Sequence, residues 1–258
     1  IETGITGGSD IALLTVGDSQ FDYLSDEEVA ELTRVLVAES AGRAVTVAAT
    51  KRWWTGKALE FAHCCREIGV DMLMMLPSQH VLSAADLADW YKAVAQVMPV
   101  MLVGKPDYQV LDGLLDEPRV CAFKEDGTLE YALETMTKYA HQWAFLTGGF
   151  YRRHLTQWPY GCHAFFSWAS SFAPRVADRY WQAVQKNDLA SATQVIVEFE
   201  APFAQLAKRN PEGWQATWRG AFELNGVAQR YLRPPRRSLT DAEMEELADG
   251  LRQIDLLA

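Results

Sequence analysis

A lysine directly follows an apolar run in the segment VCAFKEDG, residues 120–127. The run predicts a buried strand, so Lys124 would stand at the carboxyl end of that strand. A lysine held in an apolar wall loses its proton more easily than one in water, and its neutral amine can attack a carbonyl carbon to form a Schiff base. The ordinary alternative is a surface lysine that reaches solvent where a strand ends. The segment by itself leaves both interpretations open.

Cysteine and histidine, two other residue types that often do chemistry, show no functional spacing. The cysteines form no CxxC pair and lie within apolar segments, which indicates buried, reduced thiols and a cytoplasmic protein. The five histidines have neither HxH nor HExxH spacing, so we expect no metal site. The four cysteines are Cys64, Cys65, Cys121 and Cys162.

Short apolar segments alternate with helical patterns along residues 10–167 and predict the elements that position Lys124. Each segment is continuously apolar, which is typical of parallel strands covered on both faces. Repeated strand–helix units predict an α/β fold, either an open sheet or a closed barrel. A barrel needs eight strands, so its first strand would lie upstream of residue 1. The seven predicted strands are 10–16, 44–50, 71–77, 99–104, 119–123, 143–148 and 162–167.

Helical patterns follow these strands, and two of the predicted helices begin with a capping box. Ser25 with Glu28 begins the first, and Thr240 with Glu243 begins the last. Strand patterns stop after residue 174, so we expect a barrel domain over residues 1–186 and a helical segment over residues 187–258. The predicted helices are 25–42, 57–69, 84–97, 108–115, 127–140, 153–158, 175–186, 188–208, 213–230 and 240–256.

Composition excludes several function classes. The chain has 258 residues, 49% of them hydrophobic, which is enough for a sizeable core. A formal charge of −10 argues against non-specific binding of nucleic acid. No run approaches the roughly 18 apolar residues of a membrane span, and no signal-peptide pattern opens the chain. We therefore expect neither a nucleic-acid nor a membrane partner.

The segments FKEDG (123–127) and LTGG (146–149) occur in order with five other segments of the chain. Their order and spacing resemble the dihydrodipicolinate synthase / N-acetylneuraminate lyase family of class I Schiff-base aldolases and dehydratases. FKEDG is similar to the family's "KD.sG" segment, which carries the Schiff-base lysine, and LTGG is similar to its seventh strand, which ends on Gly149 here. The resemblance implies a (β/α)8 TIM barrel, Lys124 as the nucleophile and no cofactor. The other similar segments are AGRAVTVAAT (41–50), GVDMLMMLP (69–77), GCHAFFSWASSFAP (161–174), NDLASA (187–192) and LRPPRRSLTDAE (232–243).

The first departure from the family concerns the turn that binds a substrate carboxylate. The family uses GTTGE…L, whereas this chain has VGDSQFDYLS, residues 16–25. Gly17 and Asp18 replace the two threonines, and Ser19 and Gln20 replace Gly-Glu. An acid at this position would repel a carboxylate unless Asp18 turns away or a cation intervenes.

The second departure concerns the fifth strand, where the family carries its proton-relaying tyrosine in a Tyr-Asn-x-Pro segment. Here the segment is Val-Gly-Lys-Pro, with Val103 at the tyrosine's position. Valine cannot move a proton, so Tyr108, Lys105 or a group of the substrate would have to replace the tyrosine.

Several other residues carry alternatives that the sequence leaves open. Ser167 matches the serine of the family's eighth strand, where it would touch substrate or cap local backbone. Trp53 and Trp54 would roof a pocket or pack at a subunit contact. Arg152 and Arg153 would bind a carboxylate or simply begin a surface helix.

We therefore expect a cytoplasmic Schiff-base lyase, either an aldolase or a dehydratase, that acts on a 2-keto acid such as a keto-deoxy sugar acid. The resemblance and the nine tryptophans imply a homo-oligomer, a tetramer or a dimer. Val103 and Asp18 motivate the alternative of a degenerate barrel that serves as a ligand-binding or regulatory protein. The expected substrate-binding residues are Gly17, Asp18, Ser19, Gln20, Val103, Lys105, Gly149 and Ser167.

Overall fold

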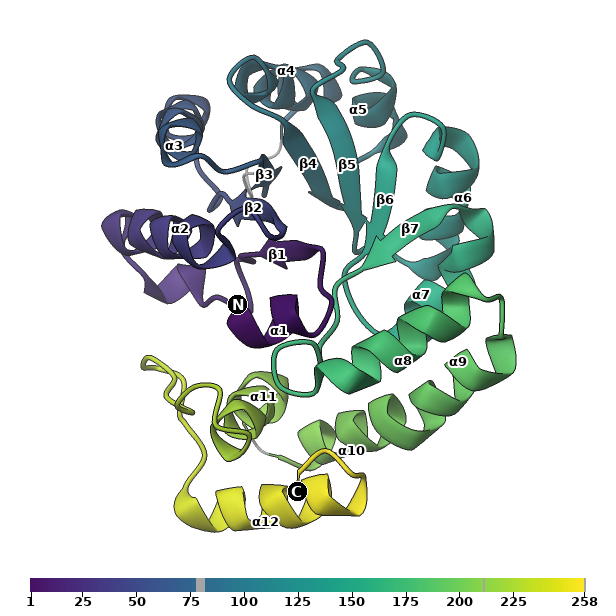
Figure 1. Ribbon diagram of the computed structural model, residues 1–258. Helices are drawn as coiled ribbons and strands as arrows, with labels where there is room; N and C mark the ends of the chain where they lie inside the picture. The colour runs from purple at the N-terminus through teal and green to yellow at the C-terminus, as the bar shows by residue number, and fades with distance from the viewer. Residues whose placement is uncertain (78–81, 211, 258) are drawn as a thin grey trace. The chain divides into compact units, whose positions relative to one another are not determined.

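The computed structural model describes residues 1–77, 82–210 and 212–257, and it contains a curled, fully parallel sheet (Figure 1). Each strand pairs with the next one along the chain, in the order β1 to β7. All seven predicted strands are confirmed, but the described residues do not complete an eight-stranded barrel. The strands are β1 (Ile11–Leu13), β2 (Val45–Ala49), β3 (Met72–Met75), β4 (Val100–Gly104), β5 (Val120–Glu125), β6 (Ala144–Thr147) and β7 (Cys162–Phe165).

The chain forms two compact units. The first unit comprises residues 10–149 and 156–166 together with residue 1, and it holds the whole sheet. The second unit comprises residues 2–9, 150–155 and 167–258. Whether residues 1–186 and 187–258 behave as separate domains stays a prediction.

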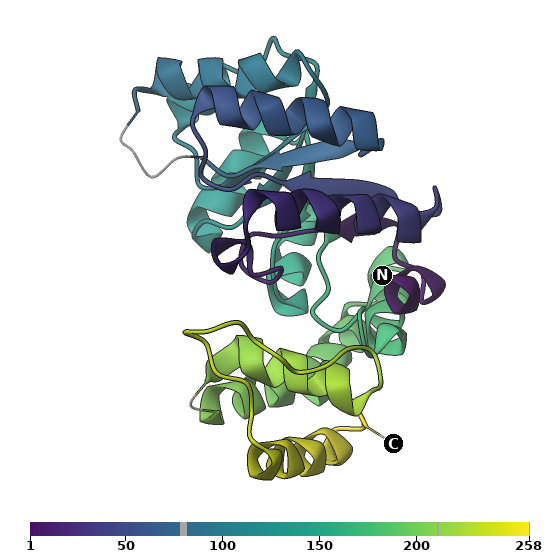
Figure 2. The ribbon, with the colours of Figure 1, turned by 90° about the vertical axis from the view of Figure 1, so that its left-hand side faces the viewer.

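Helices of the first unit cover the outer face of its sheet (Figures 1 and 2). The predicted capping box is confirmed at the start of α2, where Ser25 accepts the Glu28 N–H and the Glu28 carboxylate accepts the Ser25 N–H. The helices are α2 (Asp26–Ser40), α3 (Thr55–Ile68), α4 (Ala84–Ala95), α5 (Tyr108–Asp112) and α6 (Leu129–Tyr139), with 3-10 turns η1 (Phe21–Tyr23) and η2 (Trp158–Tyr160).

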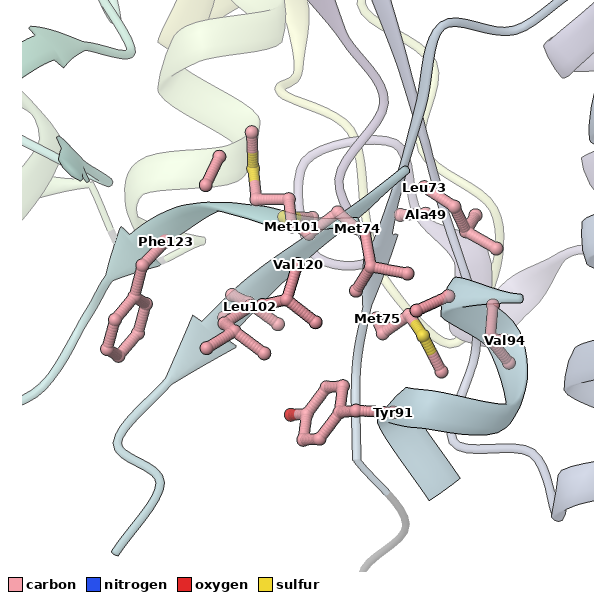
Figure 3. Close-up of a cluster of buried hydrophobic side chains, with 14 of the residues drawn as sticks. Ala49, Leu73, Met74, Met75, Tyr91, Val94, Met101, Leu102, Val120 and Phe123 are labelled. Carbon is pink, nitrogen blue, oxygen red and sulfur yellow. The ribbon is translucent and has the colours of Figure 1, made fainter. Parts of the chain in front are cut away.

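The core of the first unit lies between the sheet and these helices. Tyr91 of α4 is fully buried and lies beside Met75 of β3 and Leu102 of β4 (Figure 3). Successive residues of a strand point to opposite faces, so Met74 and Met101 lie on the other face of the sheet. Phe123 of β5 pairs in register with Leu102 and points to the same, helix-facing side of the sheet. The next residue, Lys124, therefore lies on the face opposite the helices.

The second unit is helical and has an aromatic core of its own. The Trp168 ring stacks on Phe203 at 4.5 Å between centroids, and Tyr151 stacks on Tyr180 at 4.5 Å. The capping box of Thr240 with Glu243 is confirmed at the start of the last helix. The elements are α1 (Glu2–Thr6), α8 (Pro174–Gln185), α9 (Leu189–Val195), the π-helical η3 (Ile196–Glu200), α10 (Ala201–Arg209), α11 (Gly213–Leu224) and α12 (Asp241–Gln253); α7 (Tyr151–Gln157) begins in this unit and ends in the first.

The structure bears on the sequence predictions about the thiols, membrane-spanning helices and metal sites. All four thiols are free, but only Cys65 and Cys162 are buried, whereas Cys64 and Cys121 are half-buried. None of the helices in the described part of the chain is long and apolar enough to span a membrane. The same residues contain no group of three or more histidine, cysteine or carboxylate side chains that could hold a metal ion.

Candidate active site

Lys124 lies within β5 rather than after it, because the strand continues two residues beyond its predicted end to Glu125. Its neighbours in register are Val103 on β4 and Leu146 on β6, and both of those side chains are buried. The side chain of Lys124 is only 11% exposed. The lysine therefore sits between two apolar residues near the carboxyl edge of the sheet, where parallel α/β barrels place their chemistry.

The ammonium group of Lys124 contacts a carboxylate that the sequence analysis missed. Lys124 Nζ donates a hydrogen bond to Asp126 Oδ2, and the two side chains form an ion pair. The Asp126 side chain is 32% exposed. Asp126 stands two residues after the lysine in FKEDG, and that spacing was the signal that could have identified it.

Gly148 provides the space in which this ion pair lies. A Cβ atom at this position would come within 2.0 Å of Asp126 Oδ1 and 2.2 Å of Lys124 Nζ. The sequence analysis selected the neighbouring Gly149 in the same LTGG segment. The structure identifies Gly148 as the glycine whose missing side chain is required by Lys124 and Asp126.

Glu125 anchors the turn that carries Asp126. Its carboxylate is fully buried, as expected for a residue on the helix-facing side of β5. Oε2 accepts a hydrogen bond of 3.0 Å from Gln157 Nε2, and Oε1 accepts the N–H of Gly127. Buried carboxylates are stable only when such donors satisfy them, so these bonds hold the end of β5 and the start of the next turn in place.

The predicted carboxylate-binding residues form a tight turn after β1. The Asp18 N–H donates to Thr15 Oγ1 at 3.0 Å, and the Ser19 hydroxyl accepts the Thr15 N–H at 3.1 Å. Gln20 adopts a left-handed conformation with φ of 59°, and Gly17 is exposed. Three strands separate β1 from β5 along the sheet. The role of this turn in binding substrate stays a prediction.

The two residues that the sequence analysis named as possible substitutes for the family's tyrosine both contact α6. The Tyr108 hydroxyl donates to Glu134 Oε2 of α6 at 2.8 Å. Lys105 is exposed and places Nζ 5.4 Å from the centre of the Tyr131 ring, also on α6. Gly104, the last residue of β4, adopts a left-handed conformation with φ of 92° just before Lys105. Both polar groups therefore engage α6 on the helix-facing side of the sheet.

Ser167 belongs to the second unit and has the local capping role that the sequence left open. Its Oγ accepts the N–H groups of Ala169 at 3.1 Å and Ser170 at 3.2 Å. The same oxygen lies 2.6 Å from the Tyr151 hydroxyl oxygen. Contact between Ser167 and a substrate stays a prediction.

A buried carboxylate in the second unit binds the start of α7. Glu200 is 1% exposed and accepts the N–H groups of Tyr151 and Arg152, the latter at 3.3 Å. Burial raises the pKa of Glu200 to about 7, against the opposing effect of these hydrogen bonds and of the Arg152 charge. Arg152, considered above as a substrate-carboxylate ligand, thus pairs with a carboxylate of the protein itself at 3.7 Å.

The two adjacent tryptophans separate in the structure. Trp53 packs edge-on against Phe61 of α3 with ring centroids 5.0 Å apart, whereas Trp54 is 73% exposed. Trp53 therefore joins the core of the first unit. The choice between a pocket roof and a subunit contact stays open for Trp54.

The chain matches a protein-family model over nearly its whole length and is similar to a known enzyme. The model of the dihydrodipicolinate synthetase family matches residues 1–254. A probable 5-dehydro-4-deoxyglucarate dehydratase 2 of Streptomyces avermitilis is 26% identical over 259 residues, which cover 96% of this chain and 77% of the relative.

Two solved structures share the fold. Dihydrodipicolinate synthase from Bacillus clausii superposes with a TM-score of 0.87 at 21% identity, covering 98% of this chain and 90% of the other. N-acetylneuraminate lyase from Mycoplasma synoviae superposes with a TM-score of 0.84 at 17% identity, covering 99% and 90%. The similarity thus extends over nearly the whole chain in each case.

Proposed function

Because the chain belongs to the dihydrodipicolinate synthetase family, we propose that it is a Schiff-base lyase in which Lys124 attacks the ketone of a 2-keto acid. One observation carries the proposal: Lys124 is 11% exposed and lies between Val103 and Leu146 near the carboxyl edge of a parallel sheet. A primary amine at this edge of the sheet is the nucleophile that attack on a ketone carbon requires.

The imine explains why such a lysine suits either dehydration or aldol cleavage. Once Lys124 has replaced the ketone oxygen, the positively charged imine withdraws electrons and makes the neighbouring CH2 group acidic. Loss of a proton there expels a hydroxyl group from the next carbon, which is dehydration. Alternatively, the bond between these two carbons breaks, which is aldol cleavage. Both routes need the same nucleophile. They differ in the bond that breaks, which is a carbon–oxygen bond in dehydration and a carbon–carbon bond in aldol cleavage.

We favour dehydration of a keto-deoxy sugar acid as the reaction. The relative from Streptomyces avermitilis is named for 5-dehydro-4-deoxyglucarate, a compound whose name places its ketone beside one carboxyl group and a CH2 beside the ketone. That arrangement is the one that the imine mechanism uses. The relatives named above carry enzyme names, which gives no support to the alternative of a degenerate binding protein.

Borohydride trapping tests the proposal directly. The protein is incubated with pyruvate or 5-dehydro-4-deoxyglucarate, reduced with borohydride and analysed by intact mass and peptide mapping. We expect one reduced adduct per chain, on Lys124, and no adduct in Lys124→Ala. We also expect Lys124→Ala to stay folded, because the lysine lies on the face of the sheet opposite the helices and its ammonium group contacts a partly exposed carboxylate.

Lys92→Ala is the matched control, since Lys92 forms a surface ion pair with Asp116 at 3.1 Å and should leave the adduct unchanged. A wild-type protein that gives no adduct with either keto acid would refute the proposed function. An adduct that persists in Lys124→Ala would show that another lysine is the nucleophile. Product analysis by NMR with 5-dehydro-4-deoxyglucarate then distinguishes dehydration from cleavage.

A further inference from the structure

We propose that Asp126 is the proton-transfer group of this site and acts directly on the nitrogen of Lys124 while the Schiff base forms. The proposal rests on the proposed function and deepens it, because it assigns a second catalytic residue. The resemblance described above places Val103 at the position of the family's tyrosine, and valine carries no proton donor or acceptor. The structure provides a carboxylate at the same nitrogen instead.

The contact between the two side chains is the first observation that carries this assignment. Asp126 Oδ2 accepts a hydrogen bond from Lys124 Nζ, so a proton can pass between them without an intervening water. The lysine is 11% exposed and the aspartate 32% exposed. Asp126 therefore combines contact with the nearly buried nitrogen with access to solvent, which a group that exchanges protons during turnover requires.

The fixed position of Asp126 is the second observation. Gly148 lies against both side chains, as the distances of 2.0 Å and 2.2 Å from a hypothetical Cβ show. On the other side, the preceding Glu125 is held by Gln157 and the Gly127 N–H. The turn that carries Asp126 is thus fixed from both ends. A proton-transfer group must lie within hydrogen-bonding reach of the atom it serves, and this arrangement keeps it there.

The other polar side chains near the ends of β4 and β5 are placed for different roles. Glu125 is fully buried on the helix-facing side of β5. Tyr108 donates its hydroxyl hydrogen to Glu134, and Lys105 lies over the Tyr131 ring. Asp126 is the carboxylate that the structure brings to the Lys124 nitrogen.

The proposed step balances without any further reactant. The Lys124 ammonium gives one proton to the Asp126 carboxylate, and the neutral amine attacks the ketone carbon. A proton moves from the nitrogen to the former ketone oxygen, which gives a carbinolamine. Asp126 then returns its proton to that hydroxyl group, the C–O bond breaks, and water leaves. The products are a protonated imine, one water molecule and the Asp126 carboxylate that began the step.

The rate of adduct formation tests this step. Wild type and Asp126→Asn are mixed with pyruvate, quenched with borohydride at a series of times and analysed by intact mass. We expect adduct formation in Asp126→Asn to be about 100-fold slower, the lower end of the effect of a positioned acid–base group. A carboxylate that only paired with the ammonium would take no part in the reaction, and its removal would leave the rate at or above the wild-type value.

Two further variants complete the experiment. Asp107→Asn is the matched control, because Asp107 is an exposed carboxylate that immediately precedes α5, after the neighbouring strand. Its rate should equal the wild-type rate. Asp126→Ala leaves space for a small acid, so added formate should restore part of the rate that this variant has lost. Formate added to Lys124→Ala should produce no adduct.

Each outcome separates the two proposals. An Asp126→Asn rate equal to or faster than wild type, or no effect of formate on Asp126→Ala, would overturn the role of Asp126 and leave the proposed function intact. A wild-type protein that forms no adduct would instead refute the function itself. Circular dichroism of each variant confirms that the rates are those of folded protein.

Discussion

Substitution of Gly148 by alanine should displace the Lys124 nitrogen without unfolding the protein. The added methyl carbon would lie 2.2 Å from Lys124 Nζ, 2.6 Å from its Cε and 2.0 Å from Asp126 Oδ1. These atoms are the far ends of two flexible side chains rather than backbone. We therefore expect the side chains to move and the end of β6 to keep its conformation.

The size of the movement sets the expected loss of rate. Non-bonded heavy atoms pack at about 3.5–4.0 Å, so Nζ would have to shift by more than about 1 Å. A misplacement of that size costs a reaction about 100-fold. Overpacking destabilises a closed core by about 1–3 kcal/mol, and Asp126 can relax toward solvent, so the loss of stability should lie near about 1 kcal/mol.

The assay is the pyruvate trapping time course, paired with urea unfolding of the same preparation. Gly4→Ala is the matched control, since a Cβ at Gly4 would meet its nearest atoms at an ordinary 3.7 Å. A Gly148→Ala protein that forms the adduct at the wild-type rate would refute the inferred geometry of the ion pair. Global unfolding of that variant would show instead that the backbone, not the side chains, absorbs the clash.

Two other predictions concern the second unit and the assembly. Burial raises the pKa of Glu200 from its ordinary value of 4.5 to about 7, so the folded state holds this proton more tightly. The stabilising contribution of the protonated Glu200 is complete below the unfolded pKa and is lost as pH rises through 7, by up to about 3 kcal/mol. In urea unfolding between pH 4.5 and 8, Glu200→Gln should lack this decrease in the free energy of unfolding. A pH dependence equal to that of wild type would contradict the assignment. Light scattering at micromolar concentration should show a dimer or a tetramer, and a monomer would contradict the oligomer expected from the family.

Sequence patterns predicted the secondary structure well because the determining interactions are local. Continuous apolar runs identified all seven strands, and the capping boxes at Ser25 and Thr240 identified two helix starts. Strand ends were less well predicted. β5 continues through Lys124 to Glu125, since Gln157 and the Gly127 N–H stabilise a buried carboxylate there and hydropathy alone cannot register such partners.

The site was predicted less completely because its contacts join separate strands. Lys124 followed from its position after an apolar run and from the family resemblance. Gly148 requires knowledge that the turn after β6 lies against the lysine on β5, which no local pattern contains. Tyr108 and Lys105 looked like candidate proton donors in the sequence, yet the left-handed turn at Gly104 and the contacts with α6 direct them to the helix-facing side.

The position of Asp126, the proposed proton-transfer group, also determines which residues can influence the chemistry from a distance. Val103 and Leu146 offer the Lys124 nitrogen no proton acceptor from the flanking strands, so the acceptor comes from the turn after β5. The Asp126 N–H donates a hydrogen bond of 3.4 Å to the Gly104 carbonyl oxygen of β4, which ties the turn to the neighbouring strand. The buried bond between Glu125 and Gln157 and the close packing against Gly148 hold the turn further. Gln157 lies near the end of α7, and it would act on the reaction only through the position of the turn, whereas Gly148 acts on the ion pair directly.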